Sequence, residues 1–395
     1  MAEWSCEIMA EKEVVLKLEK VSKSFAKIET DEVTHALNNV DLTMKSGEFI
    51  SLVGPSGCGK STILRLIAGL INPTTGKVTM DGKEVLEPSP ERGMVFQKPT
   101  LFPWLTVEDN IAFSLKMQGK LKGNEPKVER MLKVIGLEAF KDDYPGQLSG
   151  GMAQRVALVR SLINEPDVLL LDEPLSALDA KLRQNLLIEL DNIHDEVGIT
   201  FIFITHDQQE ALSISDRIAI MNQGNVLQVG TPAEVYESPA DMFVADFIGE
   251  NNFIEGEVVK INSDTCATLH NKEFGEILFE MDRNVKVGDK VVVSVRPEKI
   301  KVTKKKPENL SWKYNTLQVY VDEVIYTGFQ SKYFTWVNGD KNLLIKAFKQ
   351  HDIFFEDDDT DVSWDEKAFI SWNFEDSYFC LLYTSPSPRD GLLSR

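Results

Sequence analysis

The fold is decided by residues 47–70, which read GEFISLVGPSGCGKSTILRLIAGL. An apolar strand candidate, Gly47–Gly54, runs into a glycine-rich turn, and the turn opens a segment with the apolar spacing of a helix. The turn fits the pattern G-x-x-x-x-G-K-[ST], whose backbone N–H groups cradle a β-phosphate beside the positive end of a helix. In this pattern Lys60 reaches the β/γ-phosphates and the Ser61 hydroxyl binds Mg²⁺. The order of strand, loop and helix predicts an α/β nucleotide-binding domain.

Two further strand candidates end in side chains that can do chemistry. The first, Val168–Asp172, reads VLLLD and is continuously apolar, as a strand buried on both faces should be. It places Asp172 to hold Mg²⁺, mostly through water, and Glu173 to polarise or deprotonate an attacking water. An adjacent acid pair can also start an ordinary helix, but the strand and the upstream phosphate loop favour the catalytic interpretation. The second, Ile199–Asp207, contains His206 at its end, where a lone histidine more often caps or packs.

Two polar segments narrow the prediction. Gln97 follows the strand candidate GMVF, where an amide is otherwise an ordinary strand-end residue. The sequence LSGG, Leu148–Gly151, precedes the helical segment MAQRVALVRSL, and its backbone predicts a second anion nest at a helix start. One chain has no use for two phosphate nests unless two chains share each nucleotide.

Residues Val14–Gly249 resemble the ATP-binding subunits of ABC transporters in the order of these motifs. The resemblance implies that GPSGCGKST is Walker A, Gln97 the Q-loop, Leu148–Gly151 the signature, and the DE pair Walker B. It further implies that SALD, Ser176–Asp179, is the D-loop and that His206 is the switch histidine, which contacts the γ-phosphate. The implied assembly is a head-to-tail homodimer that holds two ATP molecules, each between Walker A of one subunit and LSGG of the other.

The resemblance also assigns roles to individual residues, with ATP and Mg²⁺ as cofactors. Phe25, in VSKSF, matches the aromatic position that stacks on adenine. The implied nucleotide-binding residues are Phe25, Gly54, Pro55, Ser56, Gly57, Cys58, Gly59, Lys60, Ser61, Thr62, Ser149, Gly150, Gly151 and Asp179. The implied catalytic residues are Glu173, His206 and Gln97, and the implied metal-binding residues are Ser61, Gln97 and Asp172.

Two residues stand out within these motifs. The family usually continues LSGG with Gln, whereas this chain has Met152. Because the signature contacts phosphate mainly through Ser149 and backbone amides, we expect Met152 to be tolerated. Cys58 lies near a helix N-terminus, which can make a thiol reactive, but the sequence favours a small residue that fills a tight turn.

Beyond residue 245 the pattern is almost wholly strand, with turn residues at short intervals, as in small barrels or sandwiches. The segment VSVRPEKIKV resembles the TOBE-type barrel of polyamine, ferric-iron and sugar importer ATPases. VDEVIYTGFQSKYF and AFISWNFEDSYFC look most like the spermidine/putrescine subgroup. The predicted fold is therefore an α/β P-loop NTPase, an ABC ATPase with a helical subdomain, followed by an all-β OB-like TOBE regulatory domain.

Four divisions of the chain are predicted: an N-terminal extension, 1–12; the ABC ATPase domain, 13–245; the β-rich regulatory domain, 246–380; and a tail, 381–395. The tail reads LLYTSPSPRDGLLSR and fits neither domain. It is expected to be disordered or non-native, because it resembles a translated sequencing adaptor.

The expected function is that of the ATP-hydrolysing subunit of an ABC import complex, most like those for spermidine and putrescine. Ferric iron, sugar, and sulfonate, taurine or nitrate remain alternative solutes, and LFPWLTV after Gln97 is similar to the sulfonate, taurine and nitrate importers. A metabolic kinase has no use for LSGG, and a non-transport ABC ATPase would carry a coiled-coil insertion or paired ATPase domains.

The family implies two integral-membrane permeases and, indirectly, an extracytoplasmic solute-binding protein, with the chain peripheral on the cytoplasmic face of the inner membrane. Residues Phe102–Leu105 are predicted to line a groove for a permease helix. The acidic run Glu356–Asp361 could bind a polyamine, although a solvated loop explains it better.

Composition sets outer limits on these predictions. The 395 residues suggest two or three domains, and the net charge of −19 argues against a nucleic-acid partner. Four scattered cysteines without a CxxC pair indicate a reducing compartment. The N-terminus does not look like a secretion signal, and no apolar run approaches the roughly 20 residues of a bilayer span.

Overall fold

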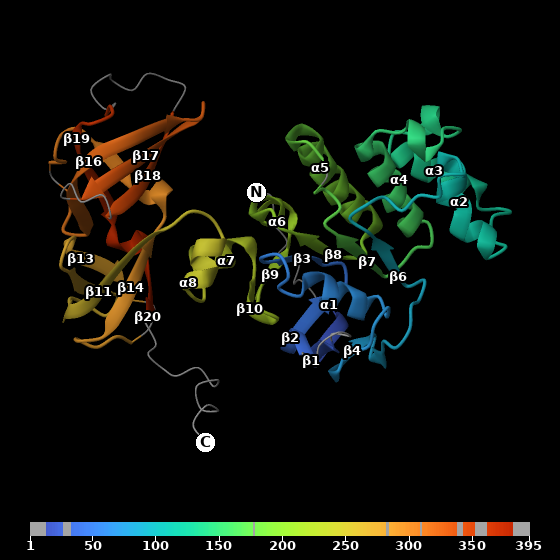
Figure 1. Cartoon of the computed structure of the whole chain (residues 1–395), viewed down its shortest axis with the longest axis horizontal. Helices are drawn as coiled ribbons and strands as arrows, with labels where there is room; N and C mark the ends of the chain where they lie inside the picture. The colour runs from blue at the N-terminus through green and yellow to red at the C-terminus, as the bar shows by residue number, and fades with distance from the viewer. Residues whose placement is uncertain are drawn as a thin grey trace, which may run out of the picture. The chain divides into compact units, whose positions relative to one another are not determined.

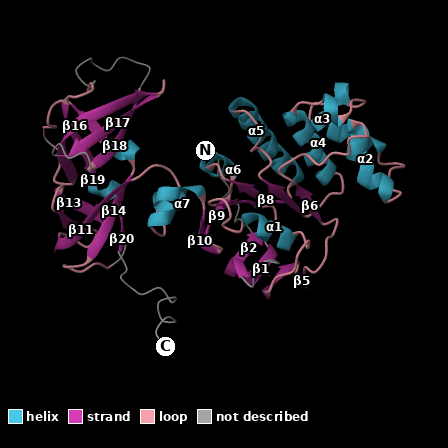
Figure 2. Ribbon diagram, in the orientation of Figure 1, coloured by secondary structure: helices cyan, strands magenta, loops and turns pink. Residues whose placement is uncertain are grey.

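The computed structural model describes residues 13–26, 33–176, 178–281, 284–308, 310–337, 343–351 and 362–381. The chain divides into two compact units, Met1–Glu237 and Ser238–Arg395 (Figure 1). The sequence placed this division near residue 245, so the short helix α8 (Met242–Phe247) is counted with the second unit and not with the ATPase domain. The first unit mixes helices and strands, whereas the second is almost entirely strand (Figure 2).

A six-stranded sheet forms the centre of the first unit, in the order β10-β9-β3-β8-β7-β6. Its strands are β3 (Phe49–Val53), β6 (Arg92–Val95), β7 (Val168–Asp172), β8 (Thr200–Thr205), β9 (Arg217–Asn222) and β10 (Asn225–Gly230). Neighbours from β9 to β6 are parallel, and β10 pairs with β9 as an antiparallel hairpin. The predicted buried strands are confirmed at β7 and β8, because both faces of these parallel strands are covered. The predicted hairpin is confirmed by the antiparallel pairing of β9 with β10.

Successive residues of the parallel strands point to opposite faces and enter different cores. On one face Ile50 and Leu170 pack in a core that includes α1 (Lys60–Ile67). On the other face Leu169 packs in a core that includes α4 (Gly150–Leu162) and α5 (Ala180–Val197).

An antiparallel sheet in the order β2-β1-β4-β5 shares the core that contains α1. Its strands are β1 (Val14–Ala26), β2 (Val33–Lys45), β4 (Thr75–Met80) and β5 (Lys83–Glu84). The sequence predicted β1 but not β2. Register shifts along the β1–β2 pairing interrupt the alternation by which a strand is recognised in sequence.

The remaining helices of this unit are α2 (Val107–Met117), α3 (Glu125–Val134), α6 (Gln208–Ile214), α7 (Pro232–Glu237) and the one-turn 3-10 helices η1 (Glu138–Phe140) and η2 (Pro145–Gln147). Helices α2, α3 and α4 contribute to a separate apolar core, which is the expected helical subdomain. Four helices in this unit begin at a side chain that accepts a backbone N–H, those of Thr106, Ser149, Asp179 and Asp207. Within the described ranges, no helix is long and apolar enough to cross a bilayer.

Two five-stranded antiparallel sheets build the second unit, in the orders β13-β12-β11-β14-β20 and β15-β19-β16-β17-β18. Their strands are β11 (Asn252–Ile261), β12 (Cys266–Asn271), β13 (Gly275–Glu280), β14 (Lys290–Val295), β15 (Lys301–Thr303), β16 (Tyr314–Tyr326), β17 (Gln330–Val337), β18 (Leu344–Gln350), β19 (Lys367–Asn373) and β20 (Ser377–Leu381), with 3-10 helices η3 (Pro297–Lys299) and η5 (Phe374–Asp376). Residues of both sheets share one core, in which Trp372 is a large, fully buried side chain. The all-β prediction for this part is confirmed.

The predicted tail needs one correction, because Leu381 pairs with Val291 in β20 and so belongs to the fold. The other predictions about segments 1–12, Glu356–Asp361 and 382–395 lie outside the described residues.

Candidate functional site

The candidate site lies at one edge of the parallel sheet, where four neighbouring strands end. Strands β3, β8, β7 and β6 run in the same direction, so their carboxyl ends meet at this edge. Ligands of open α/β sheets bind at such edges, in the crevice outside the carboxyl ends of the strands. The glycine loop follows β3, and His206, Glu173 and Gln97 follow the other three strands.

The glycine loop joins β3 to α1 through backbone conformations that exclude other residues. Gly59 precedes α1 with φ 110°, and a Cβ there would lie 2.6 Å from the Ala36 carbonyl oxygen. Gly57 has φ 79° with open space where its Cβ would be, so this part of the loop is accessible. The loop is thus held tightly at its helix end and open at its middle, as a phosphate cradle requires.

Lys60 is buried, and its Nζ donates to the carbonyl oxygens of Gly54 at 2.7 Å and Pro55 at 3.1 Å. Its ammonium therefore lies along the inside of the loop, where it can meet phosphate oxygens. The Cys58 side chain is buried beside it, and burial raises the pKa of this thiol, although the positive charge of Lys60 partly opposes the effect. This supports the interpretation of Cys58 as a filler of the turn and not as a reactive group.

Ser61 and Asp172 come together across the sheet edge. The Ser61 hydroxyl donates to Asp172 Oδ1 at 3.0 Å. Burial raises the pKa of Asp172, the Ser61 hydrogen bond lowers it in part, and the nearby Glu173 charge raises it further. A partly buried carboxylate next to a hydroxyl fits the oxygen ligands that Mg²⁺ prefers, so Ser61 and Asp172 are the residues that could hold such an ion. Among the described residues, no cluster of three or more His, Cys, Asp or Glu side chains could hold a metal ion.

Two of the predicted catalytic side chains, Gln97 and His206, converge on the carboxylate of the third, Glu173. Gln97 Nε2 lies 3.3 Å from Glu173 Oε2, and His206 Nδ1 lies 3.5 Å from the same oxygen. The Glu173 backbone has φ 45°, a left-handed conformation that is costly for a residue with a side chain. Its N–H donates to the Ile204 carbonyl at the end of β8, at 3.1 Å. The turn after β7 thus aims the carboxylate toward the ends of its two neighbouring strands.

The sequence did not predict that the Ser176 hydroxyl contacts Gln97 and Glu173. Ser176 Oγ accepts from Gln97 Nε2 at 3.3 Å and donates to the Glu173 carbonyl at 3.0 Å. Its place in SALD, soon after the acid pair, was the available signal. The next residue, Ala177, lies outside the described residues.

The LSGG segment forms the start of α4. Ser149 caps the helix by accepting from the Met152 N–H at 3.3 Å, and Ser149 and Gly150 are exposed. A Cβ on Gly151 would lie 2.6 Å from Leu182 Cδ2 of α5, so glycine is needed for close packing. Met152 packs against the core of the helical subdomain, which explains why an apolar residue is accommodated there.

Two other predicted residues lie on separate elements. Phe25 is in β1, 41% exposed, with Lys23 Nζ 5.2 Å above its ring. Asp179 caps α5 by accepting from the Leu182 N–H at 3.0 Å. Among the described residues, no hydrogen bond joins Asp179 or Ser149 to Gln97, Glu173 or His206.

Comparison with known families gives two matches along the chain. Residues 37–176 match the model of the ABC transporter family, which includes the glycine loop, the LSGG segment and the acid pair. Residues 293–377, in the second unit, match the TOBE domain model.

Curated relatives match nearly the whole chain. The spermidine/putrescine import ATP-binding protein PotA of Fusobacterium nucleatum is 52% identical over 92% of this chain and 96% of its own length. The proteins of the same name from Thermotoga maritima and Treponema pallidum are 49% and 46% identical, each over 87% of this chain.

Solved structures resemble the first part of the chain. The dimeric bacterial ABC transporter cassette MJ0796 is 35% identical, with a TM-score of 0.50, over 55% of this chain and 98% of its own. CbiO1 of Clostridium perfringens, part of the ABC transporter complex cbiONQ, is 31% identical, with a TM-score of 0.52, over 58% of this chain and 93% of its own.

Proposed function

The chain belongs to the spermidine/putrescine import ATP-binding proteins, the ATPase subunits of ABC-type polyamine import systems, and we propose that the sheet edge at Gln97, Glu173 and His206 is where it hydrolyses ATP. The observation that carries this proposal is the convergence of Gln97 Nε2 and His206 Nδ1 on the Glu173 carboxylate, at 3.3 and 3.5 Å. The Glu173 carboxylate accepts a proton from the attacking water, and His206 contacts both this carboxylate and the γ-phosphate and so positions them relative to each other.

We propose that the glycine loop binds the phosphates of ATP through its backbone N–H groups and Lys60. Ser61, Asp172 and Gln97 would hold Mg²⁺, which neutralises the charge that develops on the transferred phosphoryl group. Phe25 would stack on the adenine ring. The Ser61–Asp172 hydrogen bond at 3.0 Å supports the metal site, because it places the two oxygens next to each other.

Two phosphate nests on one chain support a head-to-tail homodimer. The glycine loop precedes α1, and the exposed Ser149–Gly150 start of α4 offers a second set of N–H groups. We propose that LSGG and Asp179 of one subunit complete the nucleotide site of the other.

Replacement of Glu173 by Gln tests the hydrolytic role. Loss of the base should lower ATP turnover by roughly 10²- to 10⁴-fold while ATP still binds, so the ATP-bound dimer should accumulate. ATPase assays and light scattering with ATP measure the two effects. Glu165→Gln is the matched control, because Glu165 also has a left-handed backbone (φ 52°) and its side chain is 77% exposed. Steady-state hydrolysis by Glu173→Gln at the rate of this control would refute the role.

We further propose that the segment Phe102–Leu105 is the contact for a permease helix on the cytoplasmic face of the membrane. The Phe102 ring packs in a tilted arrangement against Phe113 at 4.3 Å and Trp104 at 5.6 Å between ring centroids. It borders a groove of about 480 Å³ whose lining also includes Met94, Thr100 and Arg160. Arg160 Nη1 donates to the Thr100 carbonyl at 2.7 Å, which connects the groove to the residues just after Gln97.

Trp104 is the residue for testing this contact, because it is 69% exposed and its replacement should not disturb the core. In vesicles containing permeases and solute-binding protein, Trp104→Glu should abolish ATPase stimulation by spermidine and putrescine but leave the basal rate of the isolated chain unchanged. Trp364→Glu, at a 75% exposed tryptophan of the second unit, is the control. Unchanged stimulation in Trp104→Glu would exclude this docking site, and stimulation by iron or taurine alone would contradict the polyamine assignment.

A further inference from the structure

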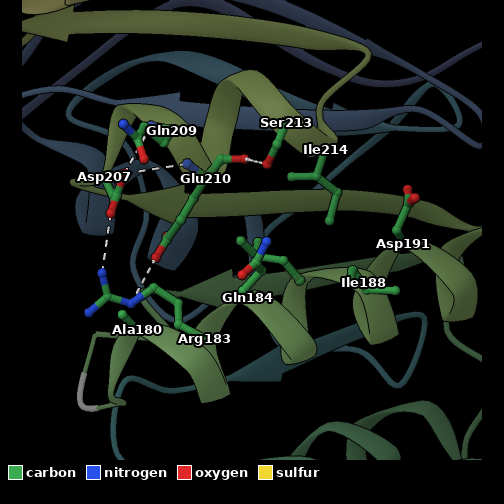
Figure 3. A pocket seen from close by; sticks show the side chains of 11 residues that line it. Ala180, Arg183, Gln184, Ile188, Asp191, Asp207, Gln209, Glu210, Ser213 and Ile214 are labelled. Atoms are coloured by element: carbon green, nitrogen blue, oxygen red, sulfur yellow. Dashed lines mark hydrogen bonds and ion pairs between the residues drawn. The ribbon is translucent and has the colours of Figure 1, made fainter. Parts of the chain in front are cut away.

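Arg183, in the first turn of α5, contacts Leu178, Asp207 and Glu210, and Figure 3 shows the contacts with the last two. Its Nη2 donates to the Leu178 carbonyl at 3.1 Å, and its Nη1 lies 3.2 Å from Asp207 Oδ2. Its Nε lies 3.4 Å from Glu210 Oε1. The planar guanidinium directs its Nη1 and Nη2 hydrogen bonds to two separate partners, whereas the Nε–Glu210 contact is an ion pair without a hydrogen bond.

Two of these contacts lead to Gln97, Glu173 and His206, the residues that we call the hydrolytic cluster. Leu178 lies in the Ser176–Asp179 segment, which begins with the Ser176 hydroxyl bound to the Glu173 carbonyl. Asp207 directly follows His206 in the chain. Glu173 comes shortly before Leu178 in the chain, His206 comes just before Asp207, and the Glu173 and His206 side chains are 3.5 Å apart. Arg183 joins the same two stretches of chain a little further along, through the Leu178 carbonyl and the Asp207 carboxylate.

The third contact anchors the guanidinium. Glu210 of α6 is almost fully buried, and its carboxylate also bonds to the Thr205 hydroxyl at the end of β8. Thr205 Oγ1 accepts from the Asp207 N–H at 3.0 Å, so a hydrogen bond joins the residue before His206 to the residue after it. Asp207 in turn caps α6 by accepting from the Gln209 N–H at 2.9 Å. The backbone on both sides of His206 is thereby tied to one charged group.

We propose that Arg183 is a positioning residue for ATP hydrolysis, which links the Ser176–Asp179 segment to Asp207 and so holds His206 in place against Glu173. This inference rests on the proposed hydrolytic function of that cluster. Arg183 itself does not touch the reacting atoms. It acts through the backbone that carries them, and displacements of about 1 Å in such groups cost on the order of 100-fold in rate.

The chain offers a matched control for removing a half-buried arginine. Arg217 Nη1 pairs with Glu48 Oε1 at 3.0 Å, with side chains 27% and 4% exposed, against 28% and 6% for the Arg183–Glu210 pair. Arg217 begins β9 and pairs with Glu48 just before β3, at the end of the sheet opposite the hydrolytic cluster. The two substitutions should therefore have similar effects on stability and different effects on catalysis.

The test compares Arg183→Ala, Arg183→Lys and Arg217→Ala in the full-length chain. Both Arg183 variants should lose kcat for ATP, by about 10- to 100-fold in Arg183→Ala, with KM unchanged, whereas Arg217→Ala should keep the wild-type kcat. Thermal unfolding should show comparable losses for Arg183→Ala and Arg217→Ala. Wild-type kcat in Arg183→Lys would overturn the proposal, and so would losses of kcat that match the loss of folded protein in both alanine variants.

Chemical rescue provides a readout that a purely structural role would not give. Arg183 lines an open groove of about 490 Å³ between α5 and α6, with Gln184, Asp191, Gln209 and Ser213 on its walls (Figure 3). Free guanidinium ions at millimolar concentration can enter there, and they should raise kcat of Arg183→Ala but not of Arg217→Ala. The absence of rescue would overturn the proposal. A wild-type chain without ATPase activity would instead refute the proposed function itself.

Discussion

At the scale of single residues, burial raises the pKa of two side chains at the phosphate-binding edge. Burial raises the pKa of the Cys58 thiol and of the Asp172 carboxyl, and the causes that oppose it, Lys60 and the Ser61 hydrogen bond, are smaller. The consequences differ, because a neutral thiol is the form that the turn needs, whereas metal binding needs the carboxylate.

Asp172→Asn should stabilise the chain in the absence of nucleotide and abolish Mg²⁺-dependent ATP binding. The raised folded-state pKa means that the ionised carboxylate disfavours folding at neutral pH. The advantage of Asn is therefore full above the folded-state pKa and disappears as the pH falls through the ordinary value of 3.8, because below it the carboxyl is protonated in both states. A gain of about 1 kcal/mol would raise Tm by roughly 2–4 °C. A lower Tm at neutral pH would contradict this account.

Cys58 should react slowly with maleimide at pH 7 in a chain that keeps it as the sole cysteine. The thiol is 3% exposed and its pKa is raised, so labelling should accelerate only above the usual thiol range. Once attached, the label should block nucleotide binding by bulk. Cys58→Ala should retain most ATPase activity, and loss of that activity would show that the thiol does more than fill the turn.

Residue identity at the site was largely predictable, because the glycine loop, the acid pair and His206 each follow a strand with a recognisable pattern. The contacts of Ser176 and Arg183 were not predictable. The SALD motif marked Ser176 but not its partners, and only the folded arrangement of β7, β8 and α5 brings these contacts together.

At the scale of elements, continuous apolar strands such as β7 and β8 were predicted from sequence, whereas β2, β4 and β5 were not. Strand β2 has buried residues at irregular spacing, and β5 is only two residues long. Strands β12 and β13 were also missed, although they pair with each other as neighbours in the chain. The partner of β20 is the distant strand β14, and that pairing is a tertiary property that local patterns do not contain.

Asn110 of α2 fixes the turn that precedes its helix, and its loss should loosen that turn. It is fully buried, accepts from the Phe102 N–H at 2.9 Å and donates to the Leu105 and Thr106 carbonyls at 3.0 Å. Asn110→Ala should lower the free energy of unfolding by about 1–3 kcal/mol and weaken polyamine stimulation of ATPase activity in the assembled transporter.

The control for Asn110 is Asn315, a buried amide that pairs with the Leu278 backbone at 2.8 Å in the second unit. Asn315→Ala should reduce stability to a similar extent without changing stimulation. Equal effects of the two substitutions on stimulation would mean that the Phe102–Leu105 turn has no special part in coupling.

At the scale of the whole molecule, the two units have separate hydrophobic cores. The clusters of the first unit include residues up to Val229, and the core of the second begins at Ile254. We expect calorimetry to show two unfolding transitions. Mg²⁺ and ATP at 100 times Kd should stabilise only the transition of the first unit, by about 2.7 kcal/mol. A single transition that shifts as a whole would contradict this expectation.

The left-handed backbone of Glu173 has a consequence for how the sequence can change. A glycine would adopt φ 45° without the cost that a side chain imposes, about 1–3 kcal/mol, so thermal stability alone would favour glycine there. Laboratory selection for heat resistance without selection for uptake should therefore enrich Glu173→Gly and produce a more durable but inactive chain. Under the proposed function, the reaction accounts for the glutamate, whereas the folding of the strand before it does not require a side chain there.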